Sequence, residues 1–341
     1  MHMQHVEKEI IDPVQLCQSN GTLNPQAIGY ARRPIIQSNL TKKFMRKKKW
    51  NYWCIFGEEI LFSVTISHFD YAAVCFVYML NYETERYIEK KIVLPFSRRI
   101  KMSEHVLDHV SFSHAQIDTH ITHAQNETKM TVIVPDFEGE RLEVDLDIFH
   151  PIEDDSLNVV IPRNRNIFQF TSKHHTLPTT GTITFGQQQF NLQSDHSFAV
   201  LDYGRGIWEK NAEWNWAMAS QRIGNRRIGL NFGGTWTDGT GMTENAIFID
   251  GKMTKIHEDM KFIYDPNNPM KQWKITTKFS NHVQLSFIPF SKHIKKATSP
   301  FMRSEVLQLI GYYNGIIQLP NCPPLYIRNM LGCAEEHHAK W

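Results

Sequence analysis

Long apolar runs are absent from this sequence of 341 residues. No window approaches the roughly 18 uncharged apolar residues that a membrane-spanning helix needs. Residues 1–10 also lack the continuous apolar core of a signal peptide. These two absences lead us to expect a cytoplasmic protein.

Cysteine is scarce and shows no metal-binding spacing. The five cysteines are widely separated and form no CxxC motif: Cys17, Cys54, Cys75, Cys322 and Cys333. This pattern favours reduced thiols over a disulfide framework or a zinc site. The nearest approach to an H-E-x-x-H motif, at 257–261, has lysine where the second histidine would stand. We therefore predict no bound metal.

Nucleotide-binding motifs and a large net charge are also missing. Gly204-Arg-Gly206 has no third glycine at dinucleotide spacing, and the glycine-rich segment 233–241 lacks the Lys-Ser/Thr pair of a phosphate-binding loop. A net charge of +2 gives no long-range field that would attract nucleic acid. The sequence therefore predicts no nucleic-acid partner and no cofactor.

One local cluster of positive charge does occur. Residues 41–50 contain six basic side chains in ten positions and end at Trp50. We favour a solvated loop that leads into a strand. The same mixture of charge and aromatic residues also fits a peripheral contact of residues 42–50 with phosphate or a membrane surface.

Period-two alternation of apolar and polar residues predicts half-buried strands along the chain. The clearest examples are 62–66, 142–148 and 283–287. Asp250-Gly251, between two short apolar segments, predicts a hairpin with a type I′ turn. Helical periodicity is confined to 99–110 and 300–310, and the second segment also reads as a strand.

The pattern predicts a mostly β protein. Two sandwiches or two barrels placed side by side would cover or remove the exposed edges of its sheets. Prolines interrupt the alternation between Ser156 and Pro178. We place the joint there, with an amino-terminal domain at 1–165 and a carboxy-terminal domain at 166–341. Nothing in the sequence predicts the oligomeric state.

Ionisable and aromatic side chains are concentrated at 201–217. An acid, a phenol, a guanidinium and three indoles in such a segment can protonate or orient a ligand and stack against it. Indoles around a carboxyl would raise its pKa by desolvation, whereas Arg205 would oppose that shift. A packed aromatic corner without a ligand explains the same composition. The candidate site residues are Asp202, Tyr203, Arg205, Trp208, Trp214, Asn215, Trp216, Asn231, Trp236, Glu244 and Asn245.

A second acidic cluster, Glu335-Glu-His-His338, lies near the end of the sequence. Neighbouring side chains on a strand point to opposite faces, so at most one histidine and one glutamate can face a given site. We favour an ion-paired chain terminus over a functional site for this cluster.

Several longer motifs resemble a known family. These include Leu16-Cys-Gln-Ser-Asn-Gly-Thr-Leu-Asn-Pro25, Lys49-Trp-Asn-Tyr-Trp-Cys54, Phe170-Thr-Ser-Lys173, the 201–217 segment, Asn231-Phe-Gly-Gly-Thr-Trp-Thr-Asp-Gly-Thr-Gly-Met-Thr-Glu-Asn245 and Gly332-Cys-Ala-Glu-Glu-His337. On these motifs nearly the whole chain resembles the family catalogued as domain of unknown function 2804, for which no activity is assigned.

A more distant resemblance, around Asp202, links the chain to the paired lipocalin-like group of carotenoid hydratases, tocopherol cyclases and Diels–Alderase-type cyclases. It implies two lipocalin-like barrels and a hydrophobic small molecule held in an aromatic barrel pocket. It also implies hydration, cyclisation or isomerisation, with Asp202 as general acid and with Tyr203 or Arg205 orienting the substrate. Tyr203 stands where the hydratases have histidine, a departure that leaves the reaction open. A non-catalytic carrier and a carbohydrate-binding protein are the alternatives.

Overall fold

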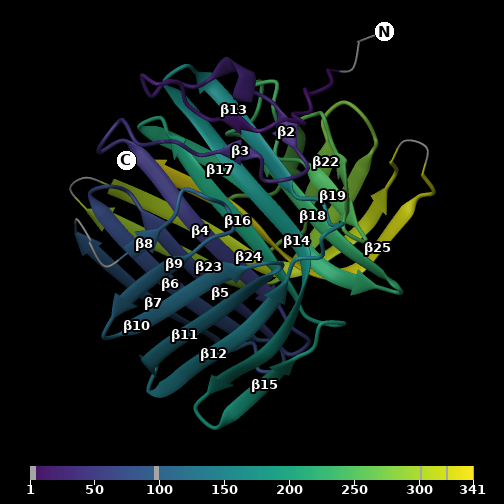
Figure 1. Cartoon of the computed structure of the whole chain (residues 1–341). Helices are drawn as coiled ribbons and strands as arrows, with labels where there is room; N and C mark the ends of the chain where they lie inside the picture. The colour runs from purple at the N-terminus through teal and green to yellow at the C-terminus, as the bar shows by residue number, and fades with distance from the viewer. Residues whose placement is uncertain (1–4, 96–99, 300–301, 320–321, 341) are drawn as a thin grey trace.

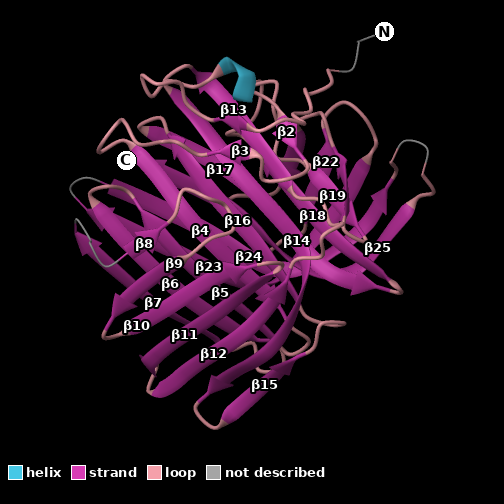
Figure 2. Cartoon of the chain, in the orientation of Figure 1, coloured by secondary structure: helices cyan, strands magenta, loops and turns pink. Residues whose placement is uncertain are grey.

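Strands make up most of the described chain, as Figure 2 shows. The computed structural model describes residues 5–95, 100–299, 302–319 and 322–340. Within these ranges the one helical element is a short 3-10 turn, η1 (Pro25–Ala27), so no helix of the described chain has the length and apolar character that a bilayer crossing requires. Two large curled antiparallel sheets pack against each other (Figure 1), which confirms the predicted mostly β fold of paired lipocalin-like barrels.

The larger sheet is built mainly from the amino-terminal part of the chain. Among the described residues its main strand order is β7 (Tyr87–Pro95), β6 (Ala72–Asn81), β5 (Ile60–His68), β4 (Lys47–Phe56), β16 (Phe198–Ile207), β14 (Ile167–Phe185), β12 (Glu140–Phe149), β11 (Glu127–Phe137), β10 (Ile117–Ala124), β9 (Val110–His114) and β8 (Ile100–Met102). This sheet also contains strands that pair outside its main strand order: β13 (Leu157–Asn164), β2 (Tyr30–Ala31) and β15 (Gln188–Leu192).

The smaller sheet is formed by the carboxy-terminal strands. Its order in the described residues is β20 (Lys252–Lys255), β19 (Ala246–Ile249), β18 (Arg226–Gly234), β17 (Asn211–Ile223), β25 (Leu325–Lys340), β24 (Met302–Ile317), β23 (Val283–Ser299), β22 (Trp273–Thr277) and β21 (Met260–Ile263). Separately, β1 (Val14–Gln15) pairs in parallel with β3 (Ile36–Gln37).

The chain passes from one sheet to the other at residues 208–210. The predicted joint at 165/166 instead falls between β13 and β14, which are hydrogen-bonded neighbours. Strands β14 and β16 follow that joint in sequence but belong to the amino-terminal sheet.

The local predictions can be compared with the observed elements. The Asp250-Gly251 hairpin is confirmed, since both residues have positive φ and join β19 to β20. Of the two candidate helices, the first is wrong over 100–110, where β8, a loop and the start of β9 lie, and the second is strand β24 from Met302 onward. Arg99, Pro300 and Phe301 lie outside the described residues.

Alternation along β4 and β16 separates two environments. Trp53, Ile55 and Leu201 point into a large apolar cluster inside the amino-terminal barrel, whereas Tyr52 and Val200 belong to a cluster that also contains side chains of β17, β24 and β25. A further cluster fills the carboxy-terminal barrel. The barrel interiors are therefore packed, and the outward faces of β4, β5, β6 and β16 are buried between the barrels.

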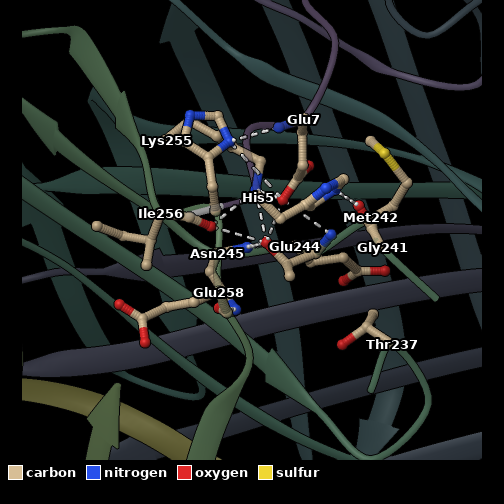
Figure 3. A network of polar contacts seen from close by, with 12 residues as sticks. His5, Glu7, Thr237, Gly241, Met242, Glu244, Asn245, Lys255, Ile256 and Glu258 are labelled. Atoms are coloured by element: carbon tan, nitrogen blue, oxygen red, sulfur yellow. Dashed lines mark hydrogen bonds and ion pairs between the residues drawn. The ribbon is translucent and has the colours of Figure 1, made fainter. Parts of the chain in front are cut away.

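The amino-terminal segment ties the two sheets together (Figure 3). At the edge of the amino-terminal sheet the Ile10 amide donates to the Tyr30 carbonyl at 2.7 Å, and the Tyr30 amide donates to the Lys8 carbonyl at 2.9 Å. Three residues before Ile10, Glu7 reaches a site on the carboxy-terminal sheet, where its Oε1 lies 2.7 Å from Lys255 Nζ and accepts from Thr243 Oγ1 at 2.9 Å. The side chains of Glu7 and Lys255 are 0% and 1% exposed. This ion pair is buried under the loop that carries Glu244.

Candidate functional site

An aromatic pocket of the described structure lies between the two sheets rather than inside either barrel. Its cavity has a volume of about 260 Å³. The sequence predicted a pocket inside a barrel, whereas this pocket lies at the interface between the barrels. Both barrel interiors are filled by their own apolar side chains. Nine aromatic residues line the pocket: Trp50, Tyr52, Phe69, Phe76, Tyr78, Trp208, Trp214, Trp216 and Trp236.

Strand register aligns the pocket residues of the amino-terminal sheet. Directly paired positions run across β14, β16, β4, β5 and β6 as Lys173, Asp202, Tyr52, Thr65 and Phe76. All five line the pocket. Because paired residues on one face of an antiparallel sheet lie side by side, this single row places a cation, an acid, a phenol and an apolar ring along one wall.

The opposite wall is formed by two rows of the carboxy-terminal sheet. Trp216, Glu335 and Gln308 are paired across β17, β25 and β24. The second row lies two residues further along these strands. It pairs Trp214 with His337 and His337 with Val306, and it ends at Lys295 on β23. All of these residues line the pocket.

A buried ammonium with two carboxylates forms the polar end of the pocket. Lys173 Nζ lies 2.9 Å from Asp202 Oδ1 and 3.3 Å from Glu244 Oε2, and it stands 4.4 Å from the centre of the Trp216 ring. Asp202 Oδ1 also accepts from Thr171 Oγ1 at 3.1 Å. Burial by itself lowers the pKa of Lys173, but the two carboxylates reverse this and raise it.

The two partners of Lys173 come from different sheets. Asp202 is on β16, while Glu244 lies in the segment that precedes β19. Burial raises the pKa of Glu244, and Lys173 opposes that shift. The ion cluster therefore bridges the sheets at the base of the pocket.

Glu335 is the second carboxyl with an unusual environment. Burial raises its pKa to about 7, against the opposing effect of a hydrogen bond donated by Trp214 Nε1 to Glu335 Oε1 at 3.0 Å. Lys173 and Lys295 also lower this pKa, but less than burial raises it. A carboxyl of this kind exchanges its proton near neutral pH.

Lys295 and His337 complete the titratable groups of this wall. Burial lowers the pKa of Lys295 to about 7, opposed by Glu89, and its Nζ lies 3.8 Å from the centre of the Phe76 ring. Burial lowers the pKa of His337 to about 3, so its imidazole is neutral at ordinary pH. This ring packs on Trp214 at 3.9 Å, with its Nε2 2.8 Å from Ser304 Oγ.

Most residues predicted from the sequence meet in this pocket. The structure places seven of the eleven on its lining: Asp202, Trp208, Trp214, Asn215, Trp216, Trp236 and Glu244. Asn231 and Asn245 lie behind the wall. Asn231 Oδ1 accepts from Trp216 Nε1 at 3.0 Å, and Asn245 Oδ1 accepts from the Gly233 amide at 2.8 Å.

Tyr203 and Arg205 point away from the pocket. They alternate with Asp202 and Gly204 along β16 and therefore face the opposite side of the sheet. Tyr203 Oη donates to the Glu104 carbonyl at 2.6 Å, and Arg205 donates to the carbonyls of Trp50, Gly204 and Ser103. The structure thus gives neither residue contact with the pocket in which it was predicted to orient a substrate.

The sequence analysis missed Lys173 and interpreted Glu335 and His337 as part of a chain terminus. The signal for Lys173 was a lysine within an otherwise uncharged strand segment, Phe168 to His174. For the acidic cluster, the alternation rule holds: Glu335 and His337 line the pocket, while Glu336 and His338 lie on the other face. In the described residues no group of three or more His, Cys, Asp or Glu side chains could hold a metal ion.

Comparison with known proteins identifies the family. A family model described as "Domain of unknown function (DUF2804)" matches residues 7–341. The chain belongs to this family. The membership predicted from the motifs is thereby confirmed, and the DUF2804 model extends over both sheets. The comparison with curated proteins gave no match.

Two solved structures are similar to this DUF2804 member. The crystal structure of CghA with Sch210972 is similar to this chain with a TM-score of 0.50 and 10% sequence identity, covering 86% of this chain and 88% of that chain. The crystal structure of kievitone hydratase from Nectria haematococca gives a TM-score of 0.42 and 11% identity, with coverage of 86% and 88%. The first similarity shows a common fold, while its low sequence identity transfers no residue roles.

Proposed function

We propose that this protein is an enzyme that binds a compact hydrophobic molecule between its two sheets and catalyses a proton-assisted hydration, cyclisation or isomerisation. The observation that carries the proposal is Glu335, a half-buried carboxyl with a pKa of about 7 on the wall of an aromatic pocket. Groups with a pKa near the working pH are the most effective general acids and bases. No cofactor takes part in the proposed reaction.

The substrate class follows from the size and lining of the pocket. A cavity of about 260 Å³ lies below the range of roughly 300 to 1,000 Å³ common for ligand pockets, so it suits a small ring system better than a long polyene. Three pocket residues have a buried polar atom without a hydrogen-bond partner in the described structure: Trp236 Nε1, Thr237 Oγ1 and Gln308 Oε1. A hydroxyl or carbonyl group on the ring system would satisfy such atoms.

Glu335 takes the role of general acid in this proposal. The sequence analysis pointed to Asp202, but Asp202 Oδ1 accepts hydrogen bonds from both Lys173 and Thr171, which is the behaviour of a fixed carboxylate. Asp202 and Glu244 instead hold Lys173 in position. The Lys173 ammonium is then available to bind a polar group of the substrate.

The proposed reaction balances without a co-reactant other than water. The Glu335 O–H bond breaks as its proton forms a C–H bond with an unsaturated carbon of the substrate. Cationic charge that develops on the neighbouring carbon is stabilised by the indole faces around it. In a hydration, water adds to that carbon and then releases a proton to the Glu335 carboxylate. In a cyclisation a second π bond of the same molecule adds instead and leaves a new cation, whereas in an isomerisation nothing adds. In both of these cases a C–H bond next to the cation breaks, its electron pair forms the new double bond, and the proton returns to Glu335.

The test compares two neighbouring glutamates. Purified wild type, Glu335→Gln and Glu336→Gln are incubated with a panel of unsaturated bicyclic alcohols and ketones, and products are followed by liquid chromatography and mass spectrometry. We expect turnover by wild type and by Glu336→Gln, whose side chain lies on the other face, and a loss of at least about 100-fold in Glu335→Gln. Saturable binding without turnover by any form would favour a carrier instead.

A further inference from the structure

The exposed turn at residues 41–46 stands at one end of the pocket. Lys48 and Phe69 line that end. The residue after Phe69, Asp70, accepts from the Met45 amide at 2.8 Å through its Oδ2 and pairs with Lys47 Nζ at 3.3 Å through its Oδ1. The turn is therefore fixed to the rim of the pocket.

Cations and apolar side chains are exposed together on this turn. Phe44 is 69% exposed and Met45 is 42% exposed. Lys42, Lys43 and Arg46 are exposed beside them. Single exposed apolar residues are common on protein surfaces, but two adjacent ones flanked by three cations form a surface of defined chemistry.

The remaining cations of the 41–50 segment have internal partners. Lys47 pairs with Asp70, Lys48 Nζ donates to Tyr71 Oη at 2.7 Å, and Lys49 pairs with Glu104. These three side chains belong to the fold. Only the first half of the basic segment, Lys42 to Arg46, is therefore presented outward.

The backbone of the turn supports a role beyond connection. Lys43 and Met45 have φ values of 66° and 67°. This left-handed backbone conformation is energetically unfavourable for any residue other than glycine. Such strained positions persist where the surrounding structure maintains them and are common at functional sites. Here Asp70 maintains the conformation by its contact with the Met45 amide.

We propose that the 41–46 turn docks on an anionic lipid surface, with Phe44 and Met45 entering the interface and Lys42, Lys43 and Arg46 facing the lipid headgroups. Basic residues near an anionic leaflet attract it, and an aromatic side chain adds affinity by leaving water. Docking in this orientation brings the Lys48 end of the pocket next to the source of a poorly water-soluble ligand. The proposal extends the function above but does not depend on which reaction occurs.

Vesicle sedimentation of the full chain tests this docking. The probes are vesicles of phosphatidylcholine alone and vesicles in which about one third of the lipid is phosphatidylserine. We expect binding to the phosphatidylserine vesicles, little binding to phosphatidylcholine, and release at about 0.5 M salt, where charge is screened over a few ångströms. Lys42→Glu/Lys43→Glu and Phe44→Ser/Met45→Ser should each weaken binding by at least about tenfold.

Phe279→Ser is the matched control. Phe279 is 80% exposed and follows Lys278, but unlike Phe44 it stands beside a lysine that is paired, with Asp259 at 3.0 Å. The control variant should bind vesicles like the wild type, and circular dichroism should show every variant folded. Equal binding to both vesicle types, no binding to either, or full binding by the Phe44→Ser/Met45→Ser variant would overturn the proposal. Binding to RNA or duplex DNA that depends on the lysines but not on Phe44 would assign the turn to nucleic acid instead.

Discussion

Two carboxyl groups in the pocket, Asp202 and Glu335, have opposite surroundings. Asp202 is held by an ammonium and a hydroxyl, whereas Glu335 accepts one indole N–H and lines the pocket between Trp216 and Gln308. Residue type alone does not separate these environments, because it depends on which strands are paired. Glu335 reaches the pocket wall because β25 is paired between β17 and β24, and this placement makes it the proposed proton donor.

Replacement of Glu335 by glutamine should reveal its pKa in the pH dependence of stability. The native carboxyl, with a pKa of about 7, binds a proton more tightly than the unfolded one, so wild-type stability falls as the pH rises from about 4.5 to about 7. Glutamine lacks this effect. We expect the free energy of unfolding of Glu335→Gln, relative to wild type, to increase by about 2 kcal/mol between pH 5 and pH 8. Urea titrations of both proteins at each pH measure this difference in unfolding free energy. A difference that does not change with pH would contradict the raised pKa of Glu335.

The Lys173 ion cluster predicts non-additive mutations. Lys173→Met leaves two carboxylates buried near each other and should lower the free energy of unfolding by about 3 to 5 kcal/mol. Asp202→Asn removes only one of two partners and should cost less, about 2 kcal/mol. The double variant should lose less unfolding free energy than the two single variants lose together, by at least about 1 kcal/mol. A double-mutant cycle in urea measures this difference. Additive effects would show that the pair is not coupled.

At the level of single strands, β16 shows what alternation can and cannot predict. The period-two rule places Asp202 and Trp208 on one face, with Tyr203 and Arg205 on the other. The sequence analysis grouped all four because they are near one another in the chain. Composition identified a strand of the pocket wall, but the face of each side chain decides which of its residues line the pocket.

Gly204 tests the packing of this strand against the pocket wall. A Cβ at position 204 would lie 2.1 Å from the Trp50 ring, so Gly204→Ala must displace that indole. We expect a loss of about 1 to 3 kcal/mol in the free energy of unfolding, together with weaker ligand binding. Gly224→Ala, in the open turn between β17 and β18 at a φ of 58°, should lose about 1 kcal/mol and bind ligand normally. Equal ligand affinity in both variants would contradict a role for the Trp50 wall.

The amino-terminal segment should depend on the buried Glu7–Lys255 pair. Glu7→Gln leaves the Lys255 ammonium, 1% exposed, without its carboxylate and should lower the free energy of unfolding by about 3 kcal/mol. The control, Glu9→Gln, loses a partner of Arg32 in a pair whose side chains are both 37% exposed, and should cost less than about 1 kcal/mol. Hydrogen exchange at the Ile10 amide should become faster only in Glu7→Gln. Unchanged exchange would mean that this pair does not hold the segment.

For the molecule as a whole, the sequence predicted the mostly β architecture because alternation and turn residues act locally. It did not locate the boundary between the sheets, because β14 and β16 join strands far away in the sequence. The position of the pocket was missed for a related reason. Both faces of β4 are buried, and only long-range pairing shows that one face belongs to a barrel core and the other to the space between barrels.

We propose above all that this space between the sheets encloses a compact hydrophobic molecule. The most direct measurement is denaturing extraction and mass spectrometry of the protein purified from its native host, with wild type and Trp216→Ala compared at equal amounts of folded protein. Our account predicts a small ring-bearing molecule that is recovered from the wild type and lost from the variant, because Trp216 lies beside both Lys173 and Glu335. A wild type that yields no such molecule, or a variant that retains it fully, would contradict the account.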